Sequence, residues 1–72
     1  MILGKLLDIV EANTKIVIDE SQTKVWQVIG NKTIIKDKSL QEILHKDTKK
    51  YEDYEVIGIE VLNNTLHIAI FK

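Results

Sequence analysis

The chain contains two imidazole side chains, His45 and His67, that could act as general bases near neutral pH. Nucleophilic catalysis needs a nucleophile, a base and an orienting group that converge in space. The sequence has no cysteine and no glycine-framed serine that could serve as the nucleophile. We expect His67 to lie opposite Glu60, which is typical of a cross-strand ion pair on a solvated face. The sequence therefore predicts a protein that is not an enzyme and has no catalytic residues.

The spacing of the polar residues indicates no metal or cofactor site. His45 and His67 match neither a helical His-x-x-x-His pair nor a metal-binding loop. The neighbouring acidic residues Glu52, Asp53 and Glu55 lack the Asp-x-Asp-x-Asp-Gly pattern of a calcium loop. Without cysteine there is no Cys-ligated zinc or iron–sulfur site, and the glycines are too far apart for a phosphate-binding loop. We expect no metal and no cofactor.

Lysines lie near aromatic residues in two parts of the chain. The two clusters are Lys24 and Trp26 with Lys32, Lys36 and Lys38, and Lys49-Lys50-Tyr51. Such clusters can stack on single-stranded bases while the ammonium groups meet phosphates. However, acidic residues interrupt both clusters, the chain has no arginine, and its net charge is -1, whereas nucleic-acid binders usually carry a basic surplus. A small nucleic-acid-binding regulator that uses the lysines around Trp26 is therefore the alternative function.

The length of the chain predicts a single domain, residues 1–72. A chain this short buries only about 60% of the surface of its unfolded form, so it needs a rich core or self-association. Ile, Leu and Val supply 25 of the 72 residues, which favours folding as a monomer and makes a homodimer the second expectation. Small secreted domains usually carry disulfides, so the lack of cysteine favours the cytoplasm. Charges interrupt the apolar first residues, and we expect neither a signal peptide nor a membrane span.

The hydrophobic pattern predicts seven elements. They are a helix over about residues 2–12 with an apolar stripe of Leu3, Leu6, Leu7 and Val10, strands at 14–19, 24–29 and 33–36, a second helix from Ser39 to Lys46 or Asp47, and two strands in the last nineteen residues. Ser39 and Glu42 have the spacing of a capping box, and Gly30-Asn31 is a turn signal. The polar residues 48–53 are expected to form a loop. The predicted fold class is α+β, in the order α-β-β-β-α-β-β, with two short helices packed on an antiparallel sheet.

The last two strands form a hairpin around the turn signal Asn63-Asn64. Counting outward from this turn predicts the cross-strand pairs. These pairs are Leu62/Thr65, Val61/Leu66, Glu60/His67, Ile59/Ile68, Gly58/Ala69, Ile57/Ile70, Val56/Phe71 and Glu55/Lys72. Three aliphatic pairs then stack on one face of the sheet. Gly58 is expected to mark a β-bulge or the close approach of another element.

The other face of this hairpin is expected to be partly apolar as well. Tyr54, Val56 and Phe71 project to it in the predicted register, and Trp26 is expected beside them. A half-buried antiparallel sheet would show one polar face, so either a helix covers this second face or it binds a partner. Trp and Tyr are frequent anchors of binding surfaces. We therefore take these four residues as candidate partner-binding residues, with a buried core position as the alternative for Trp26.

The layout resembles small proteins encoded by bacteriophages and mobile elements of low-GC Gram-positive bacteria. The likeness lies in a Leu-rich start, Leu6-Leu7-Asp8-Ile9-Val10, that runs into the strand Thr14-Lys15-Ile16-Val17-Ile18-Asp19, and in the closing hairpin from Glu55 to Ile70. Twelve Ile, ten Lys and no Arg also fit an AT-rich genome. Some such proteins bind and inhibit host or defence proteins. The small size, the missing catalytic constellation and the two apolar faces of the sheet favour a non-enzymatic protein-binding module whose partner is a protein or a second copy. The resemblance implies that it is a phage or mobile-element accessory protein.

Overall fold

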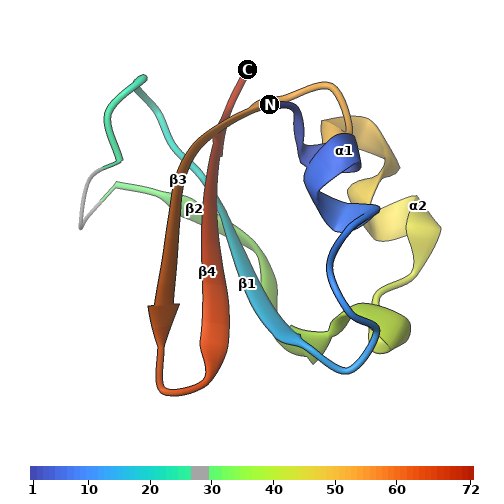
Figure 1. Cartoon of the computed structure of the whole chain (residues 1–72). Coiled ribbons are helices and arrows are strands. Elements are labelled where there is room, and N and C mark those ends of the chain that lie inside the picture. The colour runs from blue at the N-terminus through green and yellow to red at the C-terminus, as the bar shows by residue number, and fades with distance from the viewer. Residues whose placement is uncertain (27–29) are drawn as a thin grey trace.

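The computed structural model describes residues 1–26 and 30–72. Within these residues the elements are α1 (Leu3–Leu7), β1 (Lys15–Glu20), β2 (Lys32–Ser39), the 3-10 turn η1 (Leu40–Glu42), α2 (His45–Thr48), the 3-10 turn η2 (Lys49–Tyr51), β3 (Glu55–Leu62) and β4 (Thr65–Phe71). The strands form one layer, and the helices lie together on one side of it (Figure 1). The predicted α+β class is confirmed.

The four described strands form one mixed sheet in the order β2-β1-β4-β3. β1 pairs antiparallel with β2, and β3 pairs antiparallel with β4, but the central strands β1 and β4 run parallel. The prediction of a wholly antiparallel sheet is wrong for this central pair. The segment from Leu40 to Tyr54 carries the chain back along one face, so β3 begins at the same end of the sheet as β2 (Figure 1). As a consequence, β4 runs in the same direction as β1.

The core lies between the sheet and the helical segments. Leu3 and Leu6 of α1 are both buried, so the predicted apolar stripe of the first helix faces the sheet. The other buried members are Ile16, Ile18, Ile35, Tyr51, Ile68 and Ile70. Burying a side chain of this size stabilises the fold by about 1.5–3 kcal/mol relative to leaving it in water. The two central strands supply half of these core residues because they are flanked by neighbours on both sides.

The first helix is shorter than the predicted span of residues 2–12. It ends at Leu7, and the chain then turns, with the Ile9 N–H donating to the Leu6 carbonyl at 3.1 Å. Ile9 and Val10 are β-branched, which lowers their preference for a helix. The Ile9 side chain is 72% exposed, so a longer helix would gain no burial at that position.

The second helix is interrupted at Ile43 and Leu44, whose backbone is extended. The prediction of one helix from Ser39 to Lys46 or Asp47 is therefore wrong. Its apolar stripe covers only about two turns, which is too short for a helix to be stable by itself. The break separates η1 from α2, and both Ile43 and Tyr51 pack against the core. The predicted loop at 48–53 accordingly includes the helical turn η2.

The terminal hairpin has the predicted turn and, next to it, the predicted register. Asn63 and Asn64 have φ angles of 51° and 62°, as a type I′ turn requires. The five pairs from Leu62/Thr65 to Gly58/Ala69 are those that the sequence predicts. The amide-rich turn and the alternating pattern are therefore sufficient to set this part of the sheet.

Beyond Gly58 the register shifts by one residue, because Ile57 forms a β-bulge. Val56 lies opposite Ile70 and Glu55 opposite Phe71, so the three predicted pairs at this end are wrong. The expectation of a bulge or close approach at Gly58 is confirmed. The bulge also turns Val56 to the core face, where it packs on the buried residues.

The strand predicted over residues 24–29 lies partly outside the described residues. Residues 24–26 are described and belong to no strand. Gly30 has a φ of 87°, which agrees with the predicted turn. The short strand predicted at 33–36 is confirmed and is longer, from Lys32 to Ser39. In the two described ranges, no helix is long and apolar enough to cross a membrane.

Candidate functional site

One edge of the sheet has an open and regular stretch of strand. The first residues of β3 are covered by the N-terminus, since Ile2 bridges to Glu55 and the Val56 N–H donates to the Met1 carbonyl at 2.8 Å. From Gly58 to Leu62 the outer side of β3 has no paired strand among the described residues. We call this stretch, residues 58–62, the β3 edge. Its pairing with β4 is regular throughout.

The β3 edge exposes three large aliphatic side chains. Ile59, Val61 and Leu62 are 51%, 68% and 48% exposed, and Glu60 is the one charged residue among the five. The lower half of β3, leading into the turn, stands clear of both helices (Figure 1). An apolar edge strand without lysine, proline or a bulge readily accepts another strand. The geometry therefore provides a surface for strand pairing.

Trp26 lies against the same strand. Its ring packs directly on Gly58, where no side chain intervenes. Gly58 is opposite Ala69, which is fully buried, so the ring covers the face of the sheet away from the helices. Leu62 projects from this face as well, because residues 58, 60 and 62 alternate with the core-facing ones. An aromatic ring thus borders the β3 edge.

The opposite edge, β2, is built differently. Lys32, Lys36 and Lys38 are exposed along it, and two register shifts interrupt its pairing with β1. Lysines and bulges are the devices by which edge strands resist pairing with another chain. The two edges of the described sheet therefore differ: β2 is protected against pairing with a strand of another chain, and the β3 edge is not.

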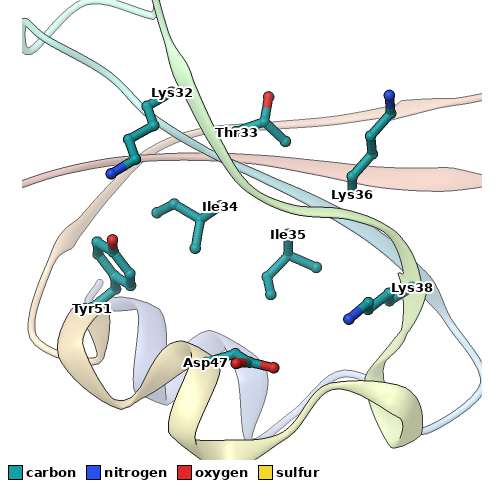
Figure 2. Close-up of a pocket in the computed structure, with 8 residues that line it drawn as sticks. All are labelled: Lys32, Thr33, Ile34, Ile35, Lys36, Lys38, Asp47 and Tyr51. Carbon is teal, nitrogen blue, oxygen red and sulfur yellow. The ribbon is translucent and has the colours of Figure 1, made fainter.

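A hollow of about 470 Å³ runs along β2. It is lined by Lys32, Thr33, Ile34, Ile35, Lys36, Lys38, Asp47 and Tyr51. In Figure 2, Lys32 and Lys38 turn toward the hollow, whereas Lys36 turns away from it. Ile34 and Ile35 lie between them, so the hollow offers ammonium groups around an apolar middle.

The orientation of Lys38 follows from the bulge that contains Asp37. Ile18 pairs with Ile35, and Ile16 pairs with Lys38. Between these two pairs β2 therefore contains one residue more than β1. Asp37 has a φ of 50°, a conformation that Asp tolerates better than most residues. Without the extra residue, side chains two apart would share a face. The bulge instead sends Lys38 to the face where α2 lies.

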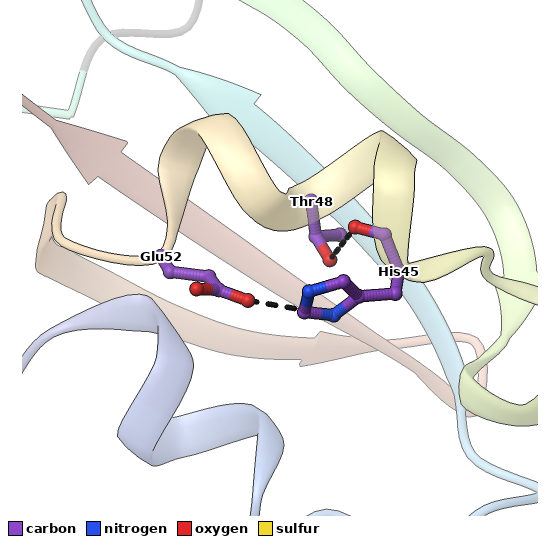
Figure 3. Close-up of polar contacts among 3 residues, drawn as sticks. All are labelled: His45, Thr48 and Glu52. Atoms are coloured by element: carbon purple, nitrogen blue, oxygen red, sulfur yellow. Dashed lines mark hydrogen bonds and ion pairs between the residues drawn. The ribbon is translucent and has the colours of Figure 1, made fainter.

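The far wall of the hollow is fixed by Tyr51. Its ring is buried, meets the ring of Tyr54 edge to face at 5.1 Å and 80°, and has the Lys50 Nζ 5.5 Å from its centroid. Next to it, His45 Nδ1 lies 3.5 Å from Glu52 Oε1, and the Thr48 hydroxyl donates to the His45 carbonyl at 3.3 Å (Figure 3). The first of these two polar contacts links α2 to the residue that follows η2, and the second lies within α2.

The structure separates the four candidate partner-binding residues. Trp26 and Phe71 are half-buried, and Phe71 adjoins the core residue Ile70, so it points to the face that Trp26 covers. Tyr54 and Val56 pack against the core instead. The prediction that all four share one face is wrong for these two, because the bulge at Ile57 reverses that end of the strand.

The histidines are likewise apart. His67 lies opposite Glu60 as predicted, but the predicted ion pair between them does not form. Among the described residues, the close contact between a histidine and a carboxylate is that of His45 and Glu52. In the part of the chain that is described, no three His, Asp or Glu side chains gather closely enough to hold a metal ion.

The β3 edge was missed in the sequence because the alternating pattern assigns Ile59 and Val61 to the core stack. Strand order decides whether such residues are covered, and an alternating pattern contains no strand order. Gly58 is the residue in the sequence that could have indicated this edge, because the absence of a side chain there lets the Trp26 ring pack on the strand. Comparisons with protein-family models, with curated proteins and with solved structures found no match.

Proposed function

We propose that this chain is a non-enzymatic protein-binding module that pairs through the β3 edge with an extended segment of a partner protein. The observation that carries the proposal is the exposure of Ile59, Val61 and Leu62 on a regular strand, to whose outer side no strand of residues 1–26 or 30–72 pairs. Edge-strand addition supplies main-chain hydrogen bonds for affinity and side-chain positions for specificity.

The side chains of the β3 edge define the chemistry of the segment. Residues opposite Ile59 and Val61 would be aliphatic, since the two side chains of each cross-strand pair then bury apolar surface against one another. The residue opposite Glu60 would be basic, because opposite charges across strands stabilise the pairing. The preferred segment therefore alternates aliphatic, basic and aliphatic residues.

The resemblance to phage and mobile-element proteins makes a host or defence protein the class of partner. The lack of cysteine supports a cytoplasmic site of action, because a chain without disulfides suits a reducing compartment.

The alternative, nucleic-acid binding, draws support from the ammonium groups that Lys32 and Lys38 present to the hollow. It is weaker for two reasons. Tyr51 is buried, so its ring has no open face on which a base could stack, and one face of the Trp26 ring is occupied by Gly58. Asp47 also places a carboxylate in the hollow, where it would repel phosphate.

Selection from a displayed library of random heptapeptides tests the proposal. We expect enriched peptides to show the aliphatic–basic–aliphatic alternation and to lose at least about tenfold in affinity for Val61→Lys. Ile9→Lys is the matched control, since Ile9 is equally exposed but lies outside the sheet. Peptides without a common alternation, or equal binding to Val61→Lys, would overturn the proposal. Binding of single-stranded oligonucleotides that Lys38→Glu abolishes would favour the alternative.

A further inference from the structure

The β3 edge has limits that define a single symmetric register. Met1 and Ile2 cover the strand up to Val56, Ile57 is bulged, and the Asn63-Asn64 turn ends it. The open stretch is therefore residues 58–62, and its midpoint is Glu60. An antiparallel pair of identical strands that covers the whole stretch must be centred on this residue.

The side chains in this register complement one another. Ile59 lies opposite Val61 of the second copy, and the symmetry repeats this pair, so the two most exposed aliphatic residues of each β3 edge cover one another. Leu62 lies opposite Gly58 of the second copy, the position that has no side chain and that Trp26 borders. A large residue thus meets a small one, and Leu62 gains the edge of an aromatic ring as its neighbour.

One pair in the register is unfavourable. Glu60 lies opposite Glu60 of the second copy, and like charges directly opposite destabilise a strand pair. His67 lies beside each of these glutamates on β4. The repulsion limits the strength of the association without changing its register, because a shift would leave Ile59 or Val61 without its partner.

We propose that a second copy of this chain occupies the β3 edge, in an antiparallel two-fold pair centred on Glu60. The second copy then occupies the same strand as the proposed foreign segment and competes with it, an inference that depends on the proposed role of the β3 edge in strand pairing. The pairing joins the two sheets into one continuous sheet. Both β2 strands, with their lysines, lie at its outer ends and remain accessible.

The chain has no cysteine, so single-cysteine variants report the register directly. In the proposed pair, the Cα atoms of the two residues at position 60 are about 4.5–5.5 Å apart, within reach of a disulfide. The two residues at position 62 are displaced by roughly 13 Å along the strand. We expect Glu60→Cys to form a covalent dimer at least about tenfold faster than Leu62→Cys, with Lys72→Cys as an off-edge control.

Sedimentation equilibrium over a concentration series provides the second measurement. Glu60→Gln should lower the dimer dissociation constant up to about fivefold, and Val61→Lys should remove the dimer while Ile9→Lys retains it. Circular dichroism verifies that each variant is folded. Faster cross-linking of Leu62→Cys than of Glu60→Cys would overturn the register, and a Glu60→Gln variant that stays monomeric at all concentrations would overturn the dimer.

The two proposals fail in different ways. If selected peptides bind wild type but not Val61→Lys, while no variant dimerises, the edge binds foreign strands and the second copy is the wrong occupant. If selected peptides also dissociate the dimer, both proposals hold. Open-ended polymers that Lys36→Glu in β2 disrupts would show pairing of β3 with β2, and would contradict the two-fold dimer.

Discussion

The ring of Trp26 lies on the backbone of Gly58: a Cβ built on this glycine would be 2.5 Å from Cε3 of Trp26. Real Cβ atoms do not approach other atoms so closely, so any side chain at position 58 must displace the ring. This contact ties the segment between β1 and β2 to the strand at the far edge of the sheet. It also gives the β3 edge its aromatic border.

Gly58→Ala should lower the free energy of unfolding by about 1–3 kcal/mol, because it overpacks this contact. Displacement of the ring into water should also shift the Trp26 emission to longer wavelength. Urea unfolding followed by fluorescence measures both effects. Gly4→Ala is the matched control: its Cβ would meet Glu52 atoms at 3.4 Å or more, and helix propensity favours Ala. Unchanged stability and emission in Gly58→Ala would refute the contact.

Substitutions at Asp37 should separate backbone strain from charge. Asp37→Val should destabilise the fold by about 1–3 kcal/mol, because a β-branched residue is poorly accommodated at a φ of 50°. Asp37→Gly should be neutral or stabilising, since glycine adopts this conformation freely. Asp37→Asn keeps the shape and removes the charge, so it serves as the control. Thermal unfolding measures the stability of each variant. Equal losses of stability in Asp37→Val and Asp37→Gly would contradict the role of the positive φ at this position.

Glu42 should make stability depend on pH. Its carboxylate accepts hydrogen bonds from the Ser39 hydroxyl at 2.7 Å and the Ser39 N–H at 2.9 Å, and these bonds hold the pKa of Glu42 below its ordinary value of 4.5. Since the folded pKa is the lower one, the stabilisation is complete above 4.5 and is lost as the pH falls through the folded pKa.

NMR titrations of the wild type and of Ser39→Ala measure the pKa of Glu42, and unfolding at several pH values measures the stability. The pKa of Glu42 should rise toward its ordinary value in Ser39→Ala, because the hydroxyl is the largest cause of the shift. The stability difference between wild type and Glu42→Gln should be largest near neutral pH and shrink in acid. Glu11→Gln is the control for a surface carboxylate. A Glu42 pKa that does not respond to Ser39→Ala would show that the hydrogen bond from the Ser39 hydroxyl is absent.

Ile68 and Val61 should differ sharply although the sequence pattern assigns them to one apolar stack. Ile68→Ala should cost about 2–5 kcal/mol, because the side chain is fully buried between β1 and β3. In the monomer, Val61→Ala should change the free energy of unfolding by no more than about 0.5 kcal/mol, since Val61 is 68% exposed in the single chain. Chemical denaturation at protein concentrations where the chain is monomeric measures both. A comparable cost at Val61 in the monomer would mean that another part of the same chain covers the β3 edge.

The sequence predicts the local structure well where short-range chemistry decides it. Asn63-Asn64 sets the turn and five cross-strand pairs, and the Leu3/Leu6 stripe sets the face of α1. Ser39 and Glu42 form the predicted capping box, in which the Ser39 N–H donates to the Glu42 carboxylate. Each of these features depends on residues a few positions apart, which is why pattern and propensity are sufficient.

Features that depend on the whole topology could not be predicted in this way. The bulge at Ile57 reverses Val56, and no local signal fixes on which side of Gly58 the extra residue lies. The parallel pairing of β1 and β4 follows from the path of the chain across the sheet, so the identity of the edge strands was hidden too. The bulge is also the reason that Tyr54 and Val56, unlike Phe71, do not lie on the predicted face.

The parallel central pair has a kinetic consequence. Lys15 pairs with Thr65 and Glu20 with Ile70, fifty positions further along the chain. Loop closure over such a distance is slow compared with the formation of either hairpin. We therefore expect the antiparallel pairs β1/β2 and β3/β4 to form first, and the pairing of β1 with β4 to be the last step of folding. A chain divided between them should reassemble from its two fragments, because each fragment carries one strand of the central ladder.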